Sequence, residues 1–288
     1  MASSDMQDVK RRIKSVSSME HITNAMKLVS AAKLRRAKAT FEKTNEYFHF
    51  ITQSIAEIFN NTSEVPDKYL AGSREIVKTC YIIVTSCRGL CGSFNSNIIK
   101  EAEADIKADP EEPVIIAIGS RGQEYFAKRG YDIHEEYLAP PESISFLETQ
   151  EISKPIIEMY NSGEIDEVVL IYTSYVSTME QKVRNVTLLP FEIESDPEVI
   201  RHEKEVEYEP SVEEVFNYLV PKYVEIMIYG AVVESATCEH AARRMAMENA
   251  TDNAREMLSD LSLFYNRARQ SAITDEIIEI VAGSEAQK

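Results

Sequence analysis

The first 60 residues contain neither proline nor glycine, the two residues that most often interrupt a helix. Apolar side chains recur through this stretch in steps of three and four, and the later steps follow the heptad spacing of a coiled coil. Examples are Val9, Ile13, Val16, Ile22, Met26, Val29, Phe41, Phe48 and Ile51. The pattern predicts one N-terminal coiled-coil helix over residues 1–60, on the order of 80 Å long at ~1.5 Å per residue.

The C-terminal segment, residues 212–288, has the same character. No proline follows Pro221, and Gly230 is the only glycine between Tyr223 and Val281, which predicts a second long helix from Tyr223 to about Val281. Its apolar seam is rich in alanine, which lets a partner helix approach closely. Because a long helix is stable only when its apolar stripe is buried, we expect the two terminal helices to form an antiparallel coiled coil.

The middle of the chain, residues 75–194, follows a different pattern. Short, β-branched apolar runs predict buried strands, and helical stretches lie between them. The predicted strands are 80–86, 113–119, 167–176 and 185–194, and the predicted helices are 94–108, 120–129 and 146–161. Alternating strands and helices predict an inserted, Rossmann-like βαβ domain with a largely parallel sheet, so the fold class is α/β. An acidic connector, residues 195–211, is expected to follow it.

The charge is unevenly distributed. The chain has a formal net charge of -17, yet residues 1–45 hold ten Lys or Arg against four Asp or Glu. Like charges gathered on one element repel one another unless an opposite charge faces them, so the basic segment predicts a partner surface. Nucleic acid, anionic lipid and an acidic protein are the three candidates.

Composition narrows the class of protein. No apolar run approaches the ~18 residues of a transmembrane helix, so no direct membrane span is expected. The basic N-terminus has the composition of an organelle transit peptide, but its continuation into a long helix argues against that interpretation, and no signal peptide is expected. Four cysteines without a disulfide framework indicate a reducing compartment.

One loop is a candidate for chemistry: SCRGLCGSFN, residues 86–95. Gly89 and Gly92 precede a predicted helix and could present backbone N–H groups to a phosphate, but the spacing is not that of a P-loop, and a tight strand-to-helix turn is favoured. Cys87 and Cys91 could form a redox pair or half of a metal site, but no second pair at zinc spacing completes it. We therefore predict no catalytic, cofactor-binding or metal-binding residues.

Three stretches resemble the γ subunit of the F-type ATP synthase. They are RRIKSVSSMEHITNAMKLVSAAKLRRA near the N-terminus, RGLCGSFNSNI in the middle, and the C-terminal EHAARRMAMENATDNAREMLSDLSLFYNRARQSAITDEIIEIVAG. The order of helix, α/β domain and helix is also that of the family. The resemblance departs from the family at Cys87, where an acidic residue is usual, and at Ser93, where glycine is usual. The Cys-bearing insertion of the light-regulated chloroplast type is missing.

The resemblance implies a non-catalytic rotor shaft. In that family the terminal helices turn inside a ring of α and β subunits, and the α/β domain joins the ε subunit and the membrane c-ring. The nucleotide sites belong to the ring, so no cofactor and no nucleic acid are expected on this chain. The implied location is peripheral, at the cytoplasmic face of a bacterial plasma membrane. Neither the coupling ion, H⁺ or Na⁺, nor the working direction follows from the sequence.

The resemblance also implies contact residues on both helices. The basic turns are expected to face acidic loops of β, and the other positions are sensitive to substitution in the family. The candidate coupling and contact residues are Met26, Lys27, Lys33, Arg35, Arg36, Arg243, Arg269, Gln270 and Thr274. Met26 could equally be ordinary seam packing, and Thr274 could bond only to its own backbone.

Two alternatives belong to other classes of protein. The first is a nucleic-acid-binding α/β protein with a basic coiled-coil arm, which predicts an affinity for RNA that falls steeply with salt. Few aromatic residues accompany the basic residues before Phe41, which disfavours it. The second is a nucleotide-dependent enzyme that uses the loop at residues 86–95.

Overall fold

The computed structural model of the chain consists of two units. Unit 1 comprises Met1–Ala31 and Arg243–Lys288, and unit 2 comprises Ala32–Ala242. The structure describes residues 2–61, 66–72, 75–109, 112–191, 209 and 211–285. The predicted acidic connector at 195–211 lies outside the described residues, apart from Glu209 and Ser211.

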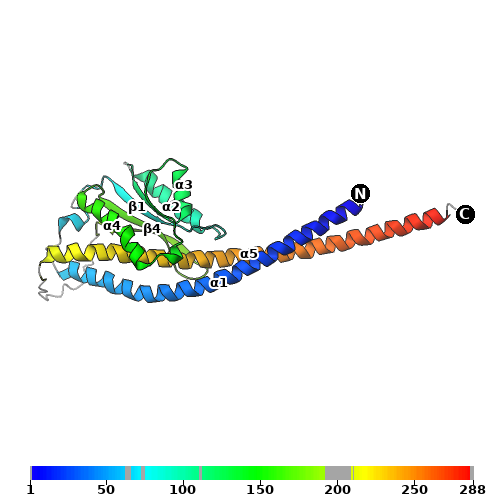
Figure 1. Ribbon diagram of the computed structural model, residues 1–288, viewed down its shortest axis with the longest axis horizontal. Coiled ribbons are helices and arrows are strands. Elements are labelled where there is room, and N and C mark those ends of the chain that lie inside the picture. Colours follow the sequence, from blue (N-terminus) through cyan, green and yellow to red (C-terminus); the bar gives the residue numbers. More distant parts are fainter. Residues whose placement is uncertain are drawn as a thin grey trace. The chain divides into compact units, whose positions relative to one another are not determined.

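Two long helices lie at the two ends of the chain (Figure 1). The first, α1, runs from Ala2 to Asn61 without interruption, as the lack of Pro and Gly predicts. The second, α5, runs from Val212 to Glu285 and contains Pro221. The helix therefore begins at Val212, where the predicted C-terminal coiled-coil segment of residues 212–288 starts, and not at Tyr223, where the position of Pro221 placed its start. Val220 and Val224 on either side of the proline are buried, and tertiary packing of this face offsets the lost backbone hydrogen bond.

A five-stranded sheet forms the centre of unit 2. Its strands are β1 (Thr79–Val84), β2 (Val114–Ile118), β3 (Ile133–Tyr137), β4 (Glu167–Tyr175) and β5 (Gln181–Leu189), in the order β3-β2-β1-β4-β5. The first four strands are parallel, and β5 pairs antiparallel with β4. The expected largely parallel sheet is confirmed, with two differences from the predicted strands.

Both differences lie at the edges of the sheet. Strand β3, with the sequence IHEEY, was not predicted because its acidic residues conceal a half-buried edge strand. Strand β5 begins at Gln181 and ends at Leu189, whereas the prediction placed it at 185–194. The first and last residues of β5 are set by its pairing with β4 from Val168 to Tyr175. A short apolar run in the sequence does not predict them.

Alternate side chains of the strands bury two cores, one on each face of the sheet. On one face, Ile82 and Leu170 pack with helix α4 (Phe146–Ser162) and with Val224 of α5. On the other face, Ile83 and Ile171 pack with helices α2 (Phe94–Ala108) and α3 (Ser120–Ala127). Figure 1 shows these helix pairs on opposite sides of the sheet. The alternation is that of strands buried on both faces.

Within unit 2, α1 lies against α5 and the sheet. Phe48 packs on the first of these cores, and a Cβ on Gly230 would lie 3.2 Å from the Phe48 ring. Phe41 meets Tyr175 edge to face at 6.2 Å. A side chain at Gly230 would displace the ring, so this glycine permits a close approach of the two helices.

Candidate functional site

In unit 1 the two helices are joined by a pair of polar contacts. The hydroxyl oxygens of Thr23 and Thr251 lie 2.8 Å apart, and both residues are buried. One turn away, the Arg255 guanidinium donates to the Glu20 carboxylate at 3.0 Å. These contacts establish an antiparallel arrangement of residues near 20–23 with residues 251–255, as the sequence predicts.

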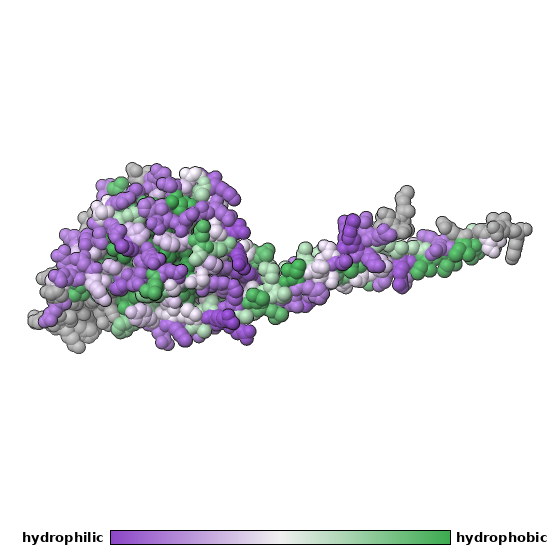
Figure 2. Space-filling model, in the orientation of Figure 1, coloured by the Kyte–Doolittle hydropathy of each residue, from purple (hydrophilic) through white to green (hydrophobic). Residues whose placement is uncertain are grey.

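The same unit carries many exposed apolar side chains. Met19, Ile22, Leu28 and Val29 of α1 are each more than half exposed. On α5 the exposed apolar residues are Met257, Leu263, Phe264, Ile273, Ile277, Ile278, Ile280 and Val281. Figure 2 shows apolar surface along these helices. Exposed apolar side chains gathered along one element in this way indicate contact with another macromolecule.

Six of the predicted contact residues lie in unit 1. Arg269, Gln270 and Thr274 are exposed on α5, and the Thr274 hydroxyl donates to the Gln270 carbonyl at 2.9 Å. Arg243 is 8% exposed, and Met26 and Lys27 are half-buried. The Thr23–Thr251 contact sets the register of the helices. Met26 lies three residues after Thr23 and Glu248 three residues before Thr251, so this register brings the two to the same level along the helices. Arg243 lies five residues before Glu248, about 7.5 Å away along the axis.

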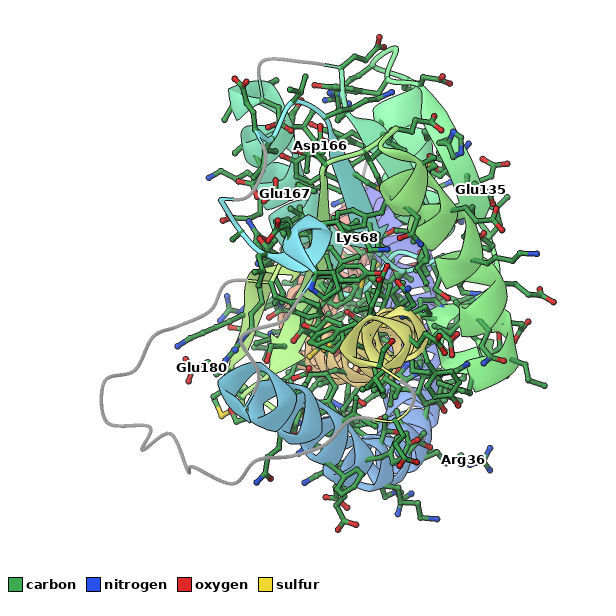
Figure 3. The ribbon with its side chains drawn as sticks, turned by 90° about the vertical axis from the view of Figure 1, so that its left-hand side faces the viewer. Arg36, Lys68, Glu135, Asp166, Glu167 and Glu180 are labelled. Carbon is green, nitrogen blue, oxygen red and sulfur yellow. The ribbon has the colours of Figure 1, made fainter. Side chains whose placement is uncertain are left out.

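The other three predicted residues lie in unit 2 and differ among themselves. Arg35 and Arg36 are exposed, and Arg36 points away from the ribbon into solvent (Figure 3). Lys33 instead pairs with Glu142 in the short helical turn η2 (Pro141–Ser143). The sequence predicts the same contact role for all three cations, but the structure shows that Lys33 bonds α1 to the turn η2 of the α/β domain.

Glu142 also binds a second helix. Its carboxylate pairs with Nε2 of His240, a residue of α5 that is 2% exposed. Burial disfavours the ionised carboxyl, but hydrogen bonds and charge interactions with Lys33 and His240 outweigh it and hold the pKa of Glu142 below its ordinary value. These three residues line a cavity of about 280 Å³ whose walls include Ile144 and Val233. No sequence pattern linked Glu142 to either partner.

The loop at residues 86–95 is filled by its own side chains. The Asn95 amide oxygen accepts from the Ser86 backbone N–H at 3.0 Å, and its NH₂ group lies 2.8 Å from the Ser86 hydroxyl. A Cβ on Gly119, where φ is +92°, would fall 2.1 Å from the Thr85 carbonyl oxygen. Side chains and close backbone contacts thus fill the loop at the carboxyl end of β1, beside the switch point between β1 and β4 where such a sheet usually binds nucleotides.

The cysteines are separate thiols. The Cys87 sulfur lies 3.3 Å from the Leu138 carbonyl, and buried Cys91 contacts Asn95. Burial raises the pKa of the Cys80 thiol to about 12, which keeps it protonated. In the part of the chain that the structure describes, no three His, Cys, Asp or Glu residues are grouped to hold a metal ion. Over the same residues, no helix is long and apolar enough to cross a membrane.

The chain is similar to known proteins over almost its whole length. A family model described as ATP synthase matches residues 5–287. The ATP synthase gamma chain of Alkaliphilus metalliredigens is 48% identical, and the match covers 98% of this chain and 99% of the relative. The gamma chain of Acetobacterium woodii, described as sodium ion specific, is 41% identical, with 98% of each chain covered.

Solved structures have the same fold. The rotor of the Euglena gracilis mitochondrial ATP synthase matches 94% of this chain and 99% of its own, with a TM-score of 0.68 and 19% identity. A central stalk and c-ring structure from Tetrahymena thermophila matches 80% of this chain and 99% of its own, with a TM-score of 0.61 and 22% identity. These likenesses confirm the architecture, and the curated relatives carry the family assignment. On that similarity, the chain belongs to the family of ATP synthase gamma chains.

Proposed function

We propose that this gamma chain is the central rotor shaft of an F-type ATP synthase, coupling ion flow through a membrane ring to ATP synthesis or hydrolysis. The observation that carries the proposal is the exposed apolar surface of unit 1. A two-helix element that leaves Phe264, Ile277 and Ile280 in water costs free energy unless a partner covers them. A ring of α and β subunits around these helices would cover them while the catalytic nucleotide sites stay in the ring.

The exposed cations would interact with the ring by charge. Arg35 and Arg36 are available to acidic loops of β, and contacts of this kind suit a turning shaft because they tolerate sliding. Each exposed pair contributes only about 0–1 kcal/mol, so they can be broken and remade at successive positions. Arg269, Gln270 and Thr274 are proposed as contacts on the C-terminal helix.

The α/β domain is proposed to join the ε subunit and the c-ring. This arrangement places the chain at the membrane through its partners, as a peripheral protein at the cytoplasmic face of a bacterial plasma membrane. The sodium ion specific relative does not fix the ion used here, because in the family the choice of H⁺ or Na⁺ belongs to other subunits.

Co-purification from native membranes tests the proposal. An affinity tag on this chain should recover α, β, ε and c subunits from membranes solubilised in a mild detergent. The recovered complex should hydrolyse ATP, and the tagged chain alone should not. Recovery of RNA in place of these subunits, with an affinity that falls steeply with salt, would instead support the nucleic-acid-binding alternative.

A further inference from the structure

The seam between the two helices of unit 1 contains few large apolar side chains. Among the described residues of this unit, those that are buried are Val9, Thr23, Ser30, Arg243, Met247, Thr251 and Ala254. Small and polar seam residues pack almost equally well after a shift along the helix axis. Apolar burial alone therefore specifies the register of these two helices weakly, and a buried polar pair is the known means of fixing one register.

The Thr23–Thr251 pair has the geometry of such a fixing contact. Thr251 is fully buried and Thr23 is 9% exposed, and their hydroxyl oxygens are 2.8 Å apart. The Thr251 hydroxyl is also 2.7 Å from the Met247 carbonyl, and the Thr23 hydroxyl is 3.1 Å from the Glu20 carbonyl. Two hydroxyl protons are thus shared among three contacts.

Each hydroxyl has one proton to donate, so two hydrogen-bonding arrangements of the pair are possible. Thr251 donates to Thr23 while Thr23 donates to the Glu20 carbonyl, or Thr23 donates to Thr251 while Thr251 donates to the Met247 carbonyl. In both arrangements one hydroxyl donates across the seam. The interhelical bond therefore survives exchange between them, and in each arrangement the hydroxyl that accepts across the seam donates to a carbonyl of its own helix.

Sliding of the helices would remove this bond. A hydrogen bond between hydroxyls needs oxygens within about 3 Å, whereas one helical turn is about 5.4 Å. A shift of one turn would bring Thr251 to the level of Met26 or Met19, whose side chains cannot replace a hydroxyl. The Glu20–Arg255 pair would be displaced by the same movement.

We propose that Thr23 and Thr251 are positioning residues that lock the register of the two helices, so that they carry torque as one body. The proposal rests on the rotor function proposed above. Twisting a two-stranded rod drives one strand along the other, and only contacts that are specific to one register resist that sliding. Without the lock, part of each rotary step is lost as slip between the helices.

The test is the double variant Thr23→Val, Thr251→Val in the intact complex, reconstituted into vesicles. Valine keeps the shape of threonine and removes the hydroxyl. We expect normal assembly and normal ATP hydrolysis when an ionophore collapses the ion gradient. When the gradient is allowed to build and oppose rotation, we expect the ions transported per ATP to fall by about twofold or more, because one net hydrogen bond shifts a register equilibrium by such a factor.

Two further variants separate register from folding. Thr23→Ser with Thr251→Ser retains both hydroxyls and should keep the wild-type ratio. Thr237→Val removes another fully buried hydroxyl of α5, which bonds to the Val233 carbonyl of its own helix, and it should leave the ratio unchanged. If the double valine variant does not assemble, Thr23→Val alone is used, because Thr251 then still bonds to the Met247 carbonyl.

A wild-type ratio under load in the valine variant would overturn the register lock. An equal loss in Thr237→Val, or no recovery in the serine variant, would also overturn it. None of these results affects the rotor proposal, which fails separately if the wild-type chain does not co-purify with the α, β and c subunits.

Discussion

Glu142 shows how a single side chain joins three segments of unit 2. Its carboxylate binds Lys33 of α1 and His240 of α5, and its own backbone belongs to the turn η2. The partners hold its pKa below the ordinary value, so the ionised form is stabilised by folding. A depressed carboxyl pKa stabilises the folded state above the unfolded pKa, and this contribution is lost as the pH falls through the folded value.

We expect Glu142→Gln to destabilise the chain by about 1 kcal/mol at neutral pH, because a partly exposed charge pair is lost. The difference from wild type should shrink as the pH falls below the ordinary carboxyl pKa of 4.5, where the unfolded chain begins to bind the proton, and should vanish below the lowered pKa of the folded chain. Urea unfolding of both full chains at a series of pH values measures this difference in the free energy of unfolding. A difference that stayed constant into acid would show that the charge on Glu142 is not the cause.

Met26 remains a predicted coupling residue, and the register sharpens its test. A lysine at this position would lie opposite Glu248, which Arg244 binds at 3.3 Å. We expect Met26→Lys to assemble normally but to transport fewer ions per ATP, because a new pair between the lysine and a carboxylate of the surrounding ring, worth up to about 1 kcal/mol, would favour one rotary state. Adding Glu248→Gln removes the carboxylate within the chain and should leave the lowered ratio unchanged. A normal ratio with poor assembly would indicate that Met26 is seam packing.

At the scale of elements, α4 is defined at both ends by local chemistry. At its start, the Ser145 hydroxyl accepts from the Glu148 backbone N–H, and the Glu148 carboxylate accepts from the Ser145 backbone N–H, forming a capping box. At its end, Gly163 has φ +76° and accommodates the left-handed turn that closes the helix. Both features depend on residues within a few positions, so this helix is predictable from sequence.

We expect Ser145→Ala to lower the free energy of unfolding of the chain by about 1 kcal/mol, the usual cost of losing an N-cap. Ser162→Ala is the matched control. Its hydroxyl donates to the Met159 carbonyl near the other end of the same helix. Its loss should lower the free energy of unfolding by only a few tenths of the effect of Ser145→Ala. Equal effects of the two substitutions in urea unfolding would contradict the capping interpretation.

At the scale of the whole molecule, the uneven charge has two roles. Acidic residues predominate in a chain of net charge -17, while Lys33, Arg35 and Arg36 lie within one short segment of α1. Lys33 is engaged within unit 2, whereas Arg35 and Arg36 face solvent. The pair of arginines is therefore the cleaner test of a charge contact with the proposed ring.

We expect Arg35→Gln with Arg36→Gln to leave the fold intact, because exposed charges contribute little to helix stability. ATP turnover of the assembled complex should fall at low ionic strength and approach wild type as salt screens the contact. Lys33→Gln should behave differently and lower the stability of the chain through its lost bond to Glu142. Unchanged turnover of the double variant at every ionic strength would contradict the charge contact.

The sequence by itself determined the features that depend on near neighbours. The lack of Pro and Gly in residues 1–60 determined α1, apolar β-branched runs determined β1, β2 and β4, and the long matching stretches determined the family. The candidate contact residues came from the resemblance, and their proposed roles await the experiments above.

Only the tertiary structure decided the rest. Strand β3 exists because β2 pairs with it, and Glu142 meets His240 although the two are 98 positions apart in the sequence. The bond between Thr23 and Thr251 joins residues 228 positions apart. Local propensity acts over one or two turns of chain, whereas these contacts form when packing brings distant segments together, and no local pattern of residue types specifies that register.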